Sequence, residues 1–123
     1  MRAVILISGN GSNLQSLIDN AKNIDLEICS VISNKEDAFG LKRAERANIS
    51  THFVDPNRFE SREDFDNQII TIIDELDIGL IILAGYMRIL SSDFINRFDG
   101  KILNIHPSLL PKFPGLNTHR KAI

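Results

Sequence analysis

The sequence of 123 residues has no tryptophan, a single cysteine and no long run of apolar residues. Cys29 therefore cannot form a disulfide within the chain, and its apolar neighbours lead us to expect a buried structural thiol, not a nucleophile. The chain also has no large excess of either charge, because its 14 basic and 16 acidic residues leave a net charge of −2. This balance argues against a nucleic-acid or polybasic membrane surface and favours small-molecule partners.

The apolar run at the start of the chain covers only residues 3–7. It is too short for the core of a signal peptide, and the sequence Gly9-Asn10-Gly11 ends it without a cleavage pattern. No other run is long enough to cross a bilayer. We therefore expect a cytoplasmic protein with no membrane partner.

Short apolar runs alternate with longer segments of helical period, which is the pattern of a parallel sheet with crossover helices. The length allows one domain, residues 1–123. We predict a three-layer, Rossmann-like α/β fold with a mostly parallel sheet, helices on both faces, and functional groups at the carboxyl ends of the strands. The expected strands are residues 3–8, 26–33, 50–54, 80–84 and 102–105.

Two expected helices carry a clear apolar stripe. In residues 14–21, apolar side chains recur at positions i, i+3, i+4 and i+7. The second helix follows Ser61, where Ser61 and Asp64 resemble a capping box. Its stripe, within residues 65–76, is typical of a core-facing helix and indicates no site.

The loop after the first expected strand, residues 8–13, reads Ser-Gly-Asn-Gly-Ser-Asn. Glycine permits a tight turn, and the N–H groups of Gly11, Ser12 and Asn13 would be free at a helix N-terminus, where the helix dipole favours an anion. The alternative is an Asn-Gly hairpin turn, but the residues that follow have helical and not alternating period. The pattern favours a phosphate-binding loop.

A dinucleotide fits this loop poorly. The dinucleotide fingerprint needs a small residue where this chain has Leu14, and an acidic residue near the end of the second strand, where the chain has Ser33-Asn34. No Gly-Lys-Ser/Thr sequence follows, which disfavours a nucleoside triphosphatase loop. We expect a phosphomonoester on a sugar.

Asn104 and His106 end the last expected strand and would point to the same face, because side chains two apart in a strand do so. Pro107 has no N–H and stops the strand there. An amide can hold an oxyanion and an imidazole can move a proton, so the pair suits acyl transfer. No serine or cysteine with an obvious base is present, which favours direct transfer over a covalent intermediate. His52 and His119 are interpreted as structural.

Three segments closely resemble the phosphoribosylglycinamide formyltransferase family, the folate-dependent enzymes of purine synthesis. They are residues 7–15 (ISGNGSNLQ), 83–90 (LAGYMRIL) and 103–115 (LNIHPSLLPKFPG), in the family's order. The resemblance implies formyl transfer from 10-formyltetrahydrofolate to the amine of glycinamide ribonucleotide, with a formyltransferase fold and no metal.

The same resemblance implies roles for individual residues. His106 would be the catalytic acid or base, and Asn104 would bind the formyl group and its oxyanion. The remaining positions divide into phosphate-binding and folate-binding sets: Gly11, Ser12 and Asn13 for the phosphate, and Arg62, Met87, Arg88, Ile89 and Leu90, with Asn104, for the folate.

Three other functions stay open at the level of sequence. Formyltetrahydrofolate hydrolase shares a similar core but needs no amine acceptor, which the phosphate loop argues against. Methionyl-tRNA formyltransferase would need a tRNA surface, which this mildly acidic chain lacks. A non-catalytic module that binds a sugar phosphate or folate belongs to a different functional class.

The sequence ends at Ile123, early in an expected helix, whereas family members continue. The resemblance implies that an aspartate which raises the pKa of the catalytic histidine lies beyond this point, so we expect His106 to be a poorer acid without it. We also expect a fold truncated after about the fifth strand, little activity from the isolated chain, and possible self-association through the open edge of residues 102–105.

Overall fold

A computed structural model describes residues 1–105, and residues 106–123, His106 and His119 among them, lie outside the described part. The strands are β1 (Arg2–Ile7), β2 (Glu27–Ser33), β3 (Ser50–Phe53), β4 (Leu80–Leu83) and β5 (Ile102–Asn104). The α-helices are α1 (Ser12–Asn20), α2 (Phe39–Arg46), α3 (Arg62–Asp74) and α4 (Ser92–Arg97), with a short 3₁₀ helix, η1, at Pro56–Arg58.

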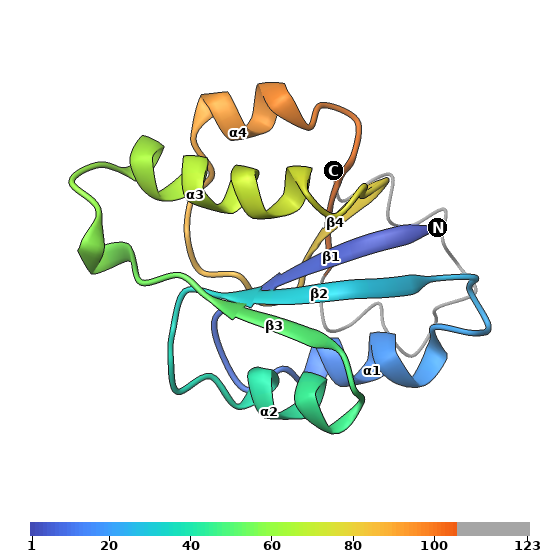
Figure 1. Ribbon diagram of the computed structural model, residues 1–123. Coiled ribbons are helices and arrows are strands. Elements are labelled where there is room, and N and C mark those ends of the chain that lie inside the picture. The colour runs from blue at the N-terminus through green and yellow to red at the C-terminus, as the bar shows by residue number, and fades with distance from the viewer. Residues whose placement is uncertain (106–123) are drawn as a thin grey trace.

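The five strands form one sheet in the order β3-β2-β1-β4-β5, and every neighbouring pair is parallel. Each predicted strand is present with its ends within one residue of the expected position. The chain builds β2 and β3 on one side of β1 and then crosses to build β4 and β5 on the other (Figure 1). This creates a topological switch point between β1 and β4, where open parallel sheets commonly bind ligands.

Helices cover both faces of the sheet, with α1 and α2 on one face and α3 and α4 on the other (Figure 1). Each face of the sheet has its own hydrophobic core, and alternate residues of β1 pack into one or the other. Ile5 packs on the face that α1 covers, and Leu6 packs on the face that α3 covers. Both are fully buried, as a central parallel strand requires. The predicted three-layer α/β architecture is confirmed.

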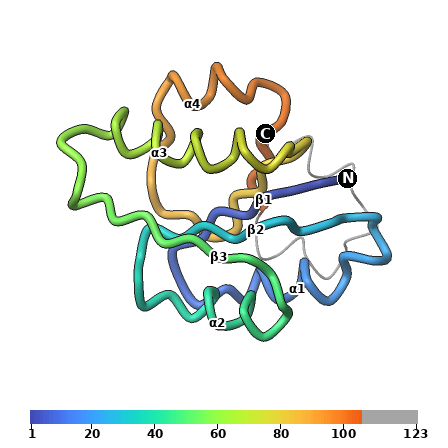
Figure 2. The backbone as a smooth tube through the Cα atoms, viewed as in Figure 1, coloured from blue at the N-terminus to red at the C-terminus, as the bar shows by residue number. Residues whose placement is uncertain are grey.

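The stripe predicted for α3 packs against the sheet, with Phe65, Ile69 and Ile73 buried. The Ser61 hydroxyl caps the helix by accepting a hydrogen bond from the Asp64 N–H at 3.1 Å. Because α3 runs opposite to the strands, its first turn lies at the edge where the strands end (Figure 2).

The expectation of a buried Cys29 is wrong in part, since this side chain is only half-buried. Its thiol lies 3.7 Å from the carbonyl oxygen of Glu27. The first residues of β2 lie at the margin of the sheet, and burial becomes complete only from Ser30 onward. Periodicity gives the length of a strand but not how far the covering helices extend along it.

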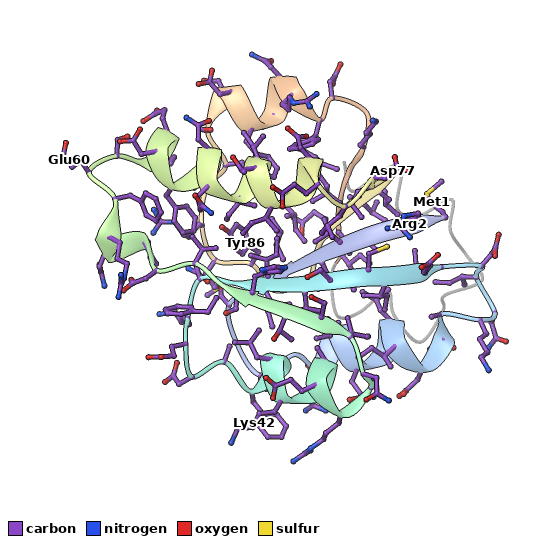
Figure 3. The ribbon with its side chains drawn as sticks, in the orientation of Figure 1. Met1, Arg2, Lys42, Glu60, Asp77 and Tyr86 are labelled. Carbon is purple, nitrogen blue, oxygen red and sulfur yellow. The ribbon has the colours of Figure 1, made fainter. Side chains whose placement is uncertain are left out.

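Met1, Arg2 and Asp77 gather at the amino-terminal edge of the strands (Figure 3). Arg2 closes this edge by donating from Nε to the Asp77 carbonyl at 3.0 Å and from a terminal nitrogen to the Leu76 carbonyl at 2.6 Å. Its guanidinium also pairs with Glu27 at 3.2 Å. The opposite edge, where the strands end, is built from loops.

Candidate functional site

The loop after β1 and the residues that follow β4 border an open cavity of about 230 Å³ at the switch point. Among residues 1–105, those that line it are all uncharged: Gly9, Asn10, Gly11, Ser12, Asn13, Ala84 and Gly85. An anion in this cavity would therefore meet backbone groups and amide or hydroxyl side chains, and no carboxylate of the lining would repel it. The three residues predicted to bind phosphate all border the cavity.

Gly11 caps α1 with a left-handed backbone, φ 80° and ψ 25°. A β-carbon built on Gly11 would lie 2.6 Å from the α-carbon of Gly40, at the start of α2. Gly40 in turn donates its N–H to the Gly9 carbonyl at 3.2 Å. The loop has its shape because two glycine backbones pack directly against each other.

One expectation about the loop is wrong in detail. The Ser12 N–H is not free, because it donates to the side-chain oxygen of Asn10 at 2.9 Å. An asparagine two residues before an N–H forms this local turn readily. A bound phosphate would have to replace the Asn10 oxygen as the partner of this N–H group.

Arg43 of α2 supports the loop from behind. Its Nε donates to the carbonyl of Asn10 at 2.7 Å, and a terminal nitrogen lies 3.4 Å from the side-chain oxygen of Gln15. The guanidinium also lies 5.0 Å from the ring centre of Phe39. The sequence analysis missed Arg43, because its contact with the loop joins residues 33 positions apart.

Asn104 is the last residue of β5 and is exposed. Its register partner is Leu83, the last residue of β4, and the next residue, Ile105, donates its N–H to the Leu83 carbonyl at 3.0 Å. Asn104 thus lies beside the last residue of β4, and Ala84, which follows that residue, borders the cavity. His106 lies outside the described residues.

The segment of residues 85–91 connects β4 to α4 and has no regular secondary structure. Met87 and Ile89 are 78% and 74% exposed, which is unusual for apolar side chains of this size. Leu90 packs against the core on the α3 side. The segment therefore presents two apolar side chains to the outside while its remaining part is held against the fold.

Arg88 and Arg62 both lie near the first turn of α3. The Arg88 guanidinium sits 4.7 Å from the ring centre of Phe65, and its Nε is buried without a partner among residues 1–105. Arg62 is the first residue of α3 and is exposed. The two arginines predicted to bind folate thus come from elements in contact, although the structure does not bring either one to the cavity at the switch point.

A second cavity, of about 410 Å³, lies beyond Arg88 at the ends of β2 and β3. Lys35 and Arg88 contribute positive charge to its lining, and Glu36, Asp37 and Asp55 contribute negative charge. The segment 85–91 therefore has one residue, Gly85, at the switch-point cavity and another, Arg88, at this second cavity.

Tyr86 points inward between α3 and the sheet (Figure 3). Burial raises the pKa of its phenol well above the ordinary value of 10.0; the Asp66 carboxylate adds to the rise, and the Arg88 guanidinium partly opposes it. The phenol oxygen has no hydrogen-bond partner within residues 1–105. Tyr86 is therefore neutral at physiological pH.

Within residues 1–105, no group of three or more histidine, cysteine or acidic side chains could hold a metal ion. The helices of the same part of the chain are all too short or too polar to cross a membrane.

A family model described as "Formyl transferase" matches residues 1–123. The phosphoribosylglycinamide formyltransferase of Escherichia coli (strain K12) is 52% identical over 125 residues, which cover 100% of this chain and 59% of that protein. The trifunctional purine biosynthetic protein adenosine-3 of Homo sapiens is 48% identical over 124 residues, which cover 99% of this chain and 12% of that protein.

Solved structures of phosphoribosylglycinamide formyltransferases also superpose on this chain. The phosphoribosylglycinamide formyltransferase of Brucella melitensis superposes with a TM-score of 0.83 at 49% identity, over 98% of this chain and 64% of that chain. The enzyme of Coxiella burnetii, in complex with CHES, gives 0.84 at 50% identity, over 99% of this chain and 58% of that chain. This chain thus spans less than two thirds of each of these relatives.

Proposed function

The chain belongs to the formyl transferase family, and from this premise we propose that it transfers a formyl group from 10-formyltetrahydrofolate to the primary amine of glycinamide ribonucleotide, in purine biosynthesis. The observation that carries the proposal is the cavity at the switch point, which is bordered by the loop after β1 and by the end of β4. Asn104 ends the next strand of the same sheet. The formyl acceptor, the formyl donor and the residue that holds the oxyanion would then meet at one edge of the sheet.

The phosphate of the ribonucleotide binds in the loop of residues 9–13. The positive end of α1 and the N–H groups of its first turn favour an anion, and the lining residues within 1–105 include no carboxylate that would repel one. Arg43 holds the Asn10 carbonyl and adds a positive charge behind the loop. The Ser12 N–H exchanges the Asn10 side chain for a phosphate oxygen.

The reduced folate is the co-substrate that supplies the formyl group. The exposed side chains of Met87 and Ile89 offer apolar contact to a flat ring system. The N–H groups of residues 88–90, which have no hydrogen bond within residues 1–105, are available to donate to it. Arg62 and Arg88 provide positive charge for the carboxylates of the folate tail.

In the reaction, the acceptor nitrogen first forms a bond to the formyl carbon and gives a tetrahedral intermediate, whose bond from that carbon to N10 of the folate then breaks. The Asn104 amide donates a hydrogen bond to the formyl oxygen as it gains charge, which is worth about 10²–10³ in rate for one such donor. His106 moves the proton that leaves the attacking amine and reaches the departing nitrogen, a contribution of about 10²–10⁴. The two binding segments hold the substrates in contact, which lowers the entropic cost of the encounter.

The experiment is a steady-state assay of the protein as its gene encodes it, with both substrates varied. We expect formylated ribonucleotide and deformylated folate in equal amounts, and no consumption of either substrate alone. Loss of the formyl group without the ribonucleotide would indicate a hydrolase instead. Binding of both substrates in titration calorimetry without turnover would indicate a non-catalytic module. The proposed place of action is the cytoplasm, and self-association through β5 stays a prediction.

A further inference from the structure

Residues 85–91, which we call the donor segment, are held at two points by buried polar side chains. The Met87 N–H donates to the Ser8 hydroxyl at 2.8 Å, and the Ser91 N–H donates to the Asp66 carboxylate at 2.7 Å. Ser8 is 3% exposed and Asp66 is 1% exposed. Within residues 1–105, the hydrogen bonds recorded for N–H groups of the donor segment are these two.

We call these two hydrogen bonds the anchors. They hold the backbone to buried groups, whereas two apolar side chains of the same segment are exposed. Met87 exposes 78% of its side chain and Ile89 exposes 74%, although the N–H of Met87 is tied to a buried hydroxyl. A flexible loop would lower its free energy by turning such side chains inward, because removal of apolar surface from water is favourable. The anchors hold the backbone in a conformation that keeps both side chains available to a ligand.

The Ser8 hydroxyl makes two hydrogen bonds with a defined direction. It accepts from the Met87 N–H and donates to the side-chain oxygen of Asn34 at 2.6 Å. Asn34, which follows β2, is itself only 8% exposed. Because the Ser8 O–H points to the Asn34 side-chain oxygen, the lone pairs of the Ser8 oxygen are left to accept from the Met87 N–H.

Ser8 is also the residue immediately before Gly9, with which the cavity lining begins. One hydroxyl therefore connects the start of the phosphate loop with the donor segment, across the β1–β4 switch point. A shift of either segment relative to the other would stretch the 2.8 Å bond.

We propose that Ser8 and Asp66 are positioning residues that fix the donor segment at its two ends, and that Ser8 in addition sets the position of the donor segment relative to the phosphate loop. This inference rests on the proposed function, because it assigns the purpose of the two anchors to the binding of reduced folate. Neither residue contacts a substrate; both act through the backbone of residues 87–91.

Loss of one anchor leaves a backbone N–H without its partner and lets the segment move, so folate binding must first restore the order that the anchor supplied. We expect Ser8→Ala and Asp66→Ala each to raise the KM for 10-formyltetrahydrofolate about tenfold, which corresponds to the net loss of about one hydrogen bond. The KM for glycinamide ribonucleotide should stay within about twofold of the wild-type value, since the loop N–H groups remain in place.

Asp66→Asn is the conservative variant. Its side-chain oxygen can still accept from the Ser91 N–H, so we expect its folate KM to lie much closer to the wild-type value than the KM of Asp66→Ala does. This split between two variants at one buried position separates the loss of a hydrogen bond from a general loss of packing.

Ser30→Ala is the matched control. Ser30 is fully buried, and its hydroxyl donates to the Ser50 carbonyl at 3.1 Å, between β2 and β3 and away from the donor segment. The substitution removes a buried serine hydroxyl and a hydrogen bond to a backbone group, as Ser8→Ala does. We expect it to lower stability and to leave both KM values unchanged.

Amide hydrogen exchange gives a second readout that does not depend on turnover. The Met87 amide should exchange faster in Ser8→Ala, and the Ser91 amide should do so in Asp66→Ala. If Ser8→Ala does not fold, Asn34→Ala leaves the Ser8 hydroxyl in place but frees it from its orienting partner, and it carries the same prediction for the folate KM.

A folate KM within about twofold of wild type in both anchor variants, with an active wild-type protein, would overturn the inference and leave the proposed function intact. An equal rise in Ser30→Ala would overturn it as well. An inactive wild-type protein would contradict the proposed function itself.

Discussion

The backbones of Gly11 and Gly40 pack directly against each other, and a β-carbon on Gly11 would lie 2.6 Å from the α-carbon of Gly40. This contact joins the phosphate loop to the start of α2. A β-carbon on Gly40 would in turn meet the tip of the buried Ile7 side chain, which would have to move. The loop geometry therefore depends on two glycines that are far apart in the sequence.

Gly11→Ala should lower both stability and acceptor binding. The left-handed backbone costs about 1–2 kcal/mol for a residue with a β-carbon, and relief of the contact with Gly40 should cost about 1–3 kcal/mol more. Urea unfolding measures the loss of stability, and the KM for glycinamide ribonucleotide measures the loss of acceptor binding.

Gly100→Ala separates the two contributions. Gly100 has nearly the same backbone angle, φ 78°, but a β-carbon there would meet no atom of the described residues within 4 Å. We expect only the backbone cost of about 1–2 kcal/mol and an unchanged KM. Equal losses of stability in the two variants would show that the Gly11–Gly40 contact has no role.

Arg43→Met should weaken binding of the ribonucleotide, because it removes the hydrogen bond to the Asn10 carbonyl and a positive charge behind the loop. We expect the KM for the ribonucleotide to rise about tenfold, as for the loss of one charge-assisted hydrogen bond, and the KM for the folate to stay the same. Arg46→Met is the control, since Arg46 packs 5.3 Å from the same Phe39 ring in the next turn of α2. A similar change in both variants would assign the effect to net charge alone.

The sequence predicted β1 and β4 well because each is a nearly continuous apolar run bounded by polar or glycine-containing segments. It also predicted α1 and the Ser61 cap of α3. Two helices were not assigned ranges: α2 buries only Gly40 and Ala44, and α4 has six residues. Short helices with few buried residues carry too weak a periodic signal, and their position depends on tertiary contacts.

The candidate site was predictable only where its residues are close in sequence. The loop of residues 9–13 fulfils that condition, whereas the bond from Met87 to Ser8 joins residues 79 positions apart. Asp66 did leave a signal, since it shares a helix face with Ile69 and Ile73, at positions i, i+3 and i+7. An acidic residue on an apolar stripe indicates a buried partner, here the Ser91 N–H.

Asn104→Asp should reduce kcat by about 10²–10³, with small changes in both KM values, because a carboxylate repels the charge that develops on the formyl oxygen. Asn104 is exposed, so the free energy of unfolding should change little. Lys101→Ala, just before the amino end of the same strand, should leave kcat unchanged. A kcat for Asn104→Asp close to wild type would remove Asn104 from the reaction.

Tyr86→Phe should increase stability at pH 7 by about 1 kcal/mol, because the phenol oxygen is buried without a partner in residues 1–105. The wild-type protein should also lose stability as the pH rises above 10. The folded pKa of Tyr86 lies above its unfolded value, so above pH 10 the unfolded chain releases a proton that the folded chain retains.

Urea unfolding between pH 7 and 11 checks this prediction. The loss above pH 10 should be smaller in Tyr86→Phe than in the wild type. Tyr86 is the one tyrosine among the 123 residues, so phenolate absorbance of this chain reports its titration directly. Ionisation of the folded chain at its ordinary pKa of 10.0 would contradict the buried placement.

The fate of a labelled formyl group tests the central claim most directly. The protein is given 10-formyltetrahydrofolate that carries an isotope in the formyl carbon, together with glycinamide ribonucleotide, and the label is followed by mass spectrometry. Direct transfer across the β1–β4 switch point predicts that the label appears in the ribonucleotide in an amount equal to the folate product. Label recovered as free formate, at the same rate with and without the ribonucleotide, would contradict the account.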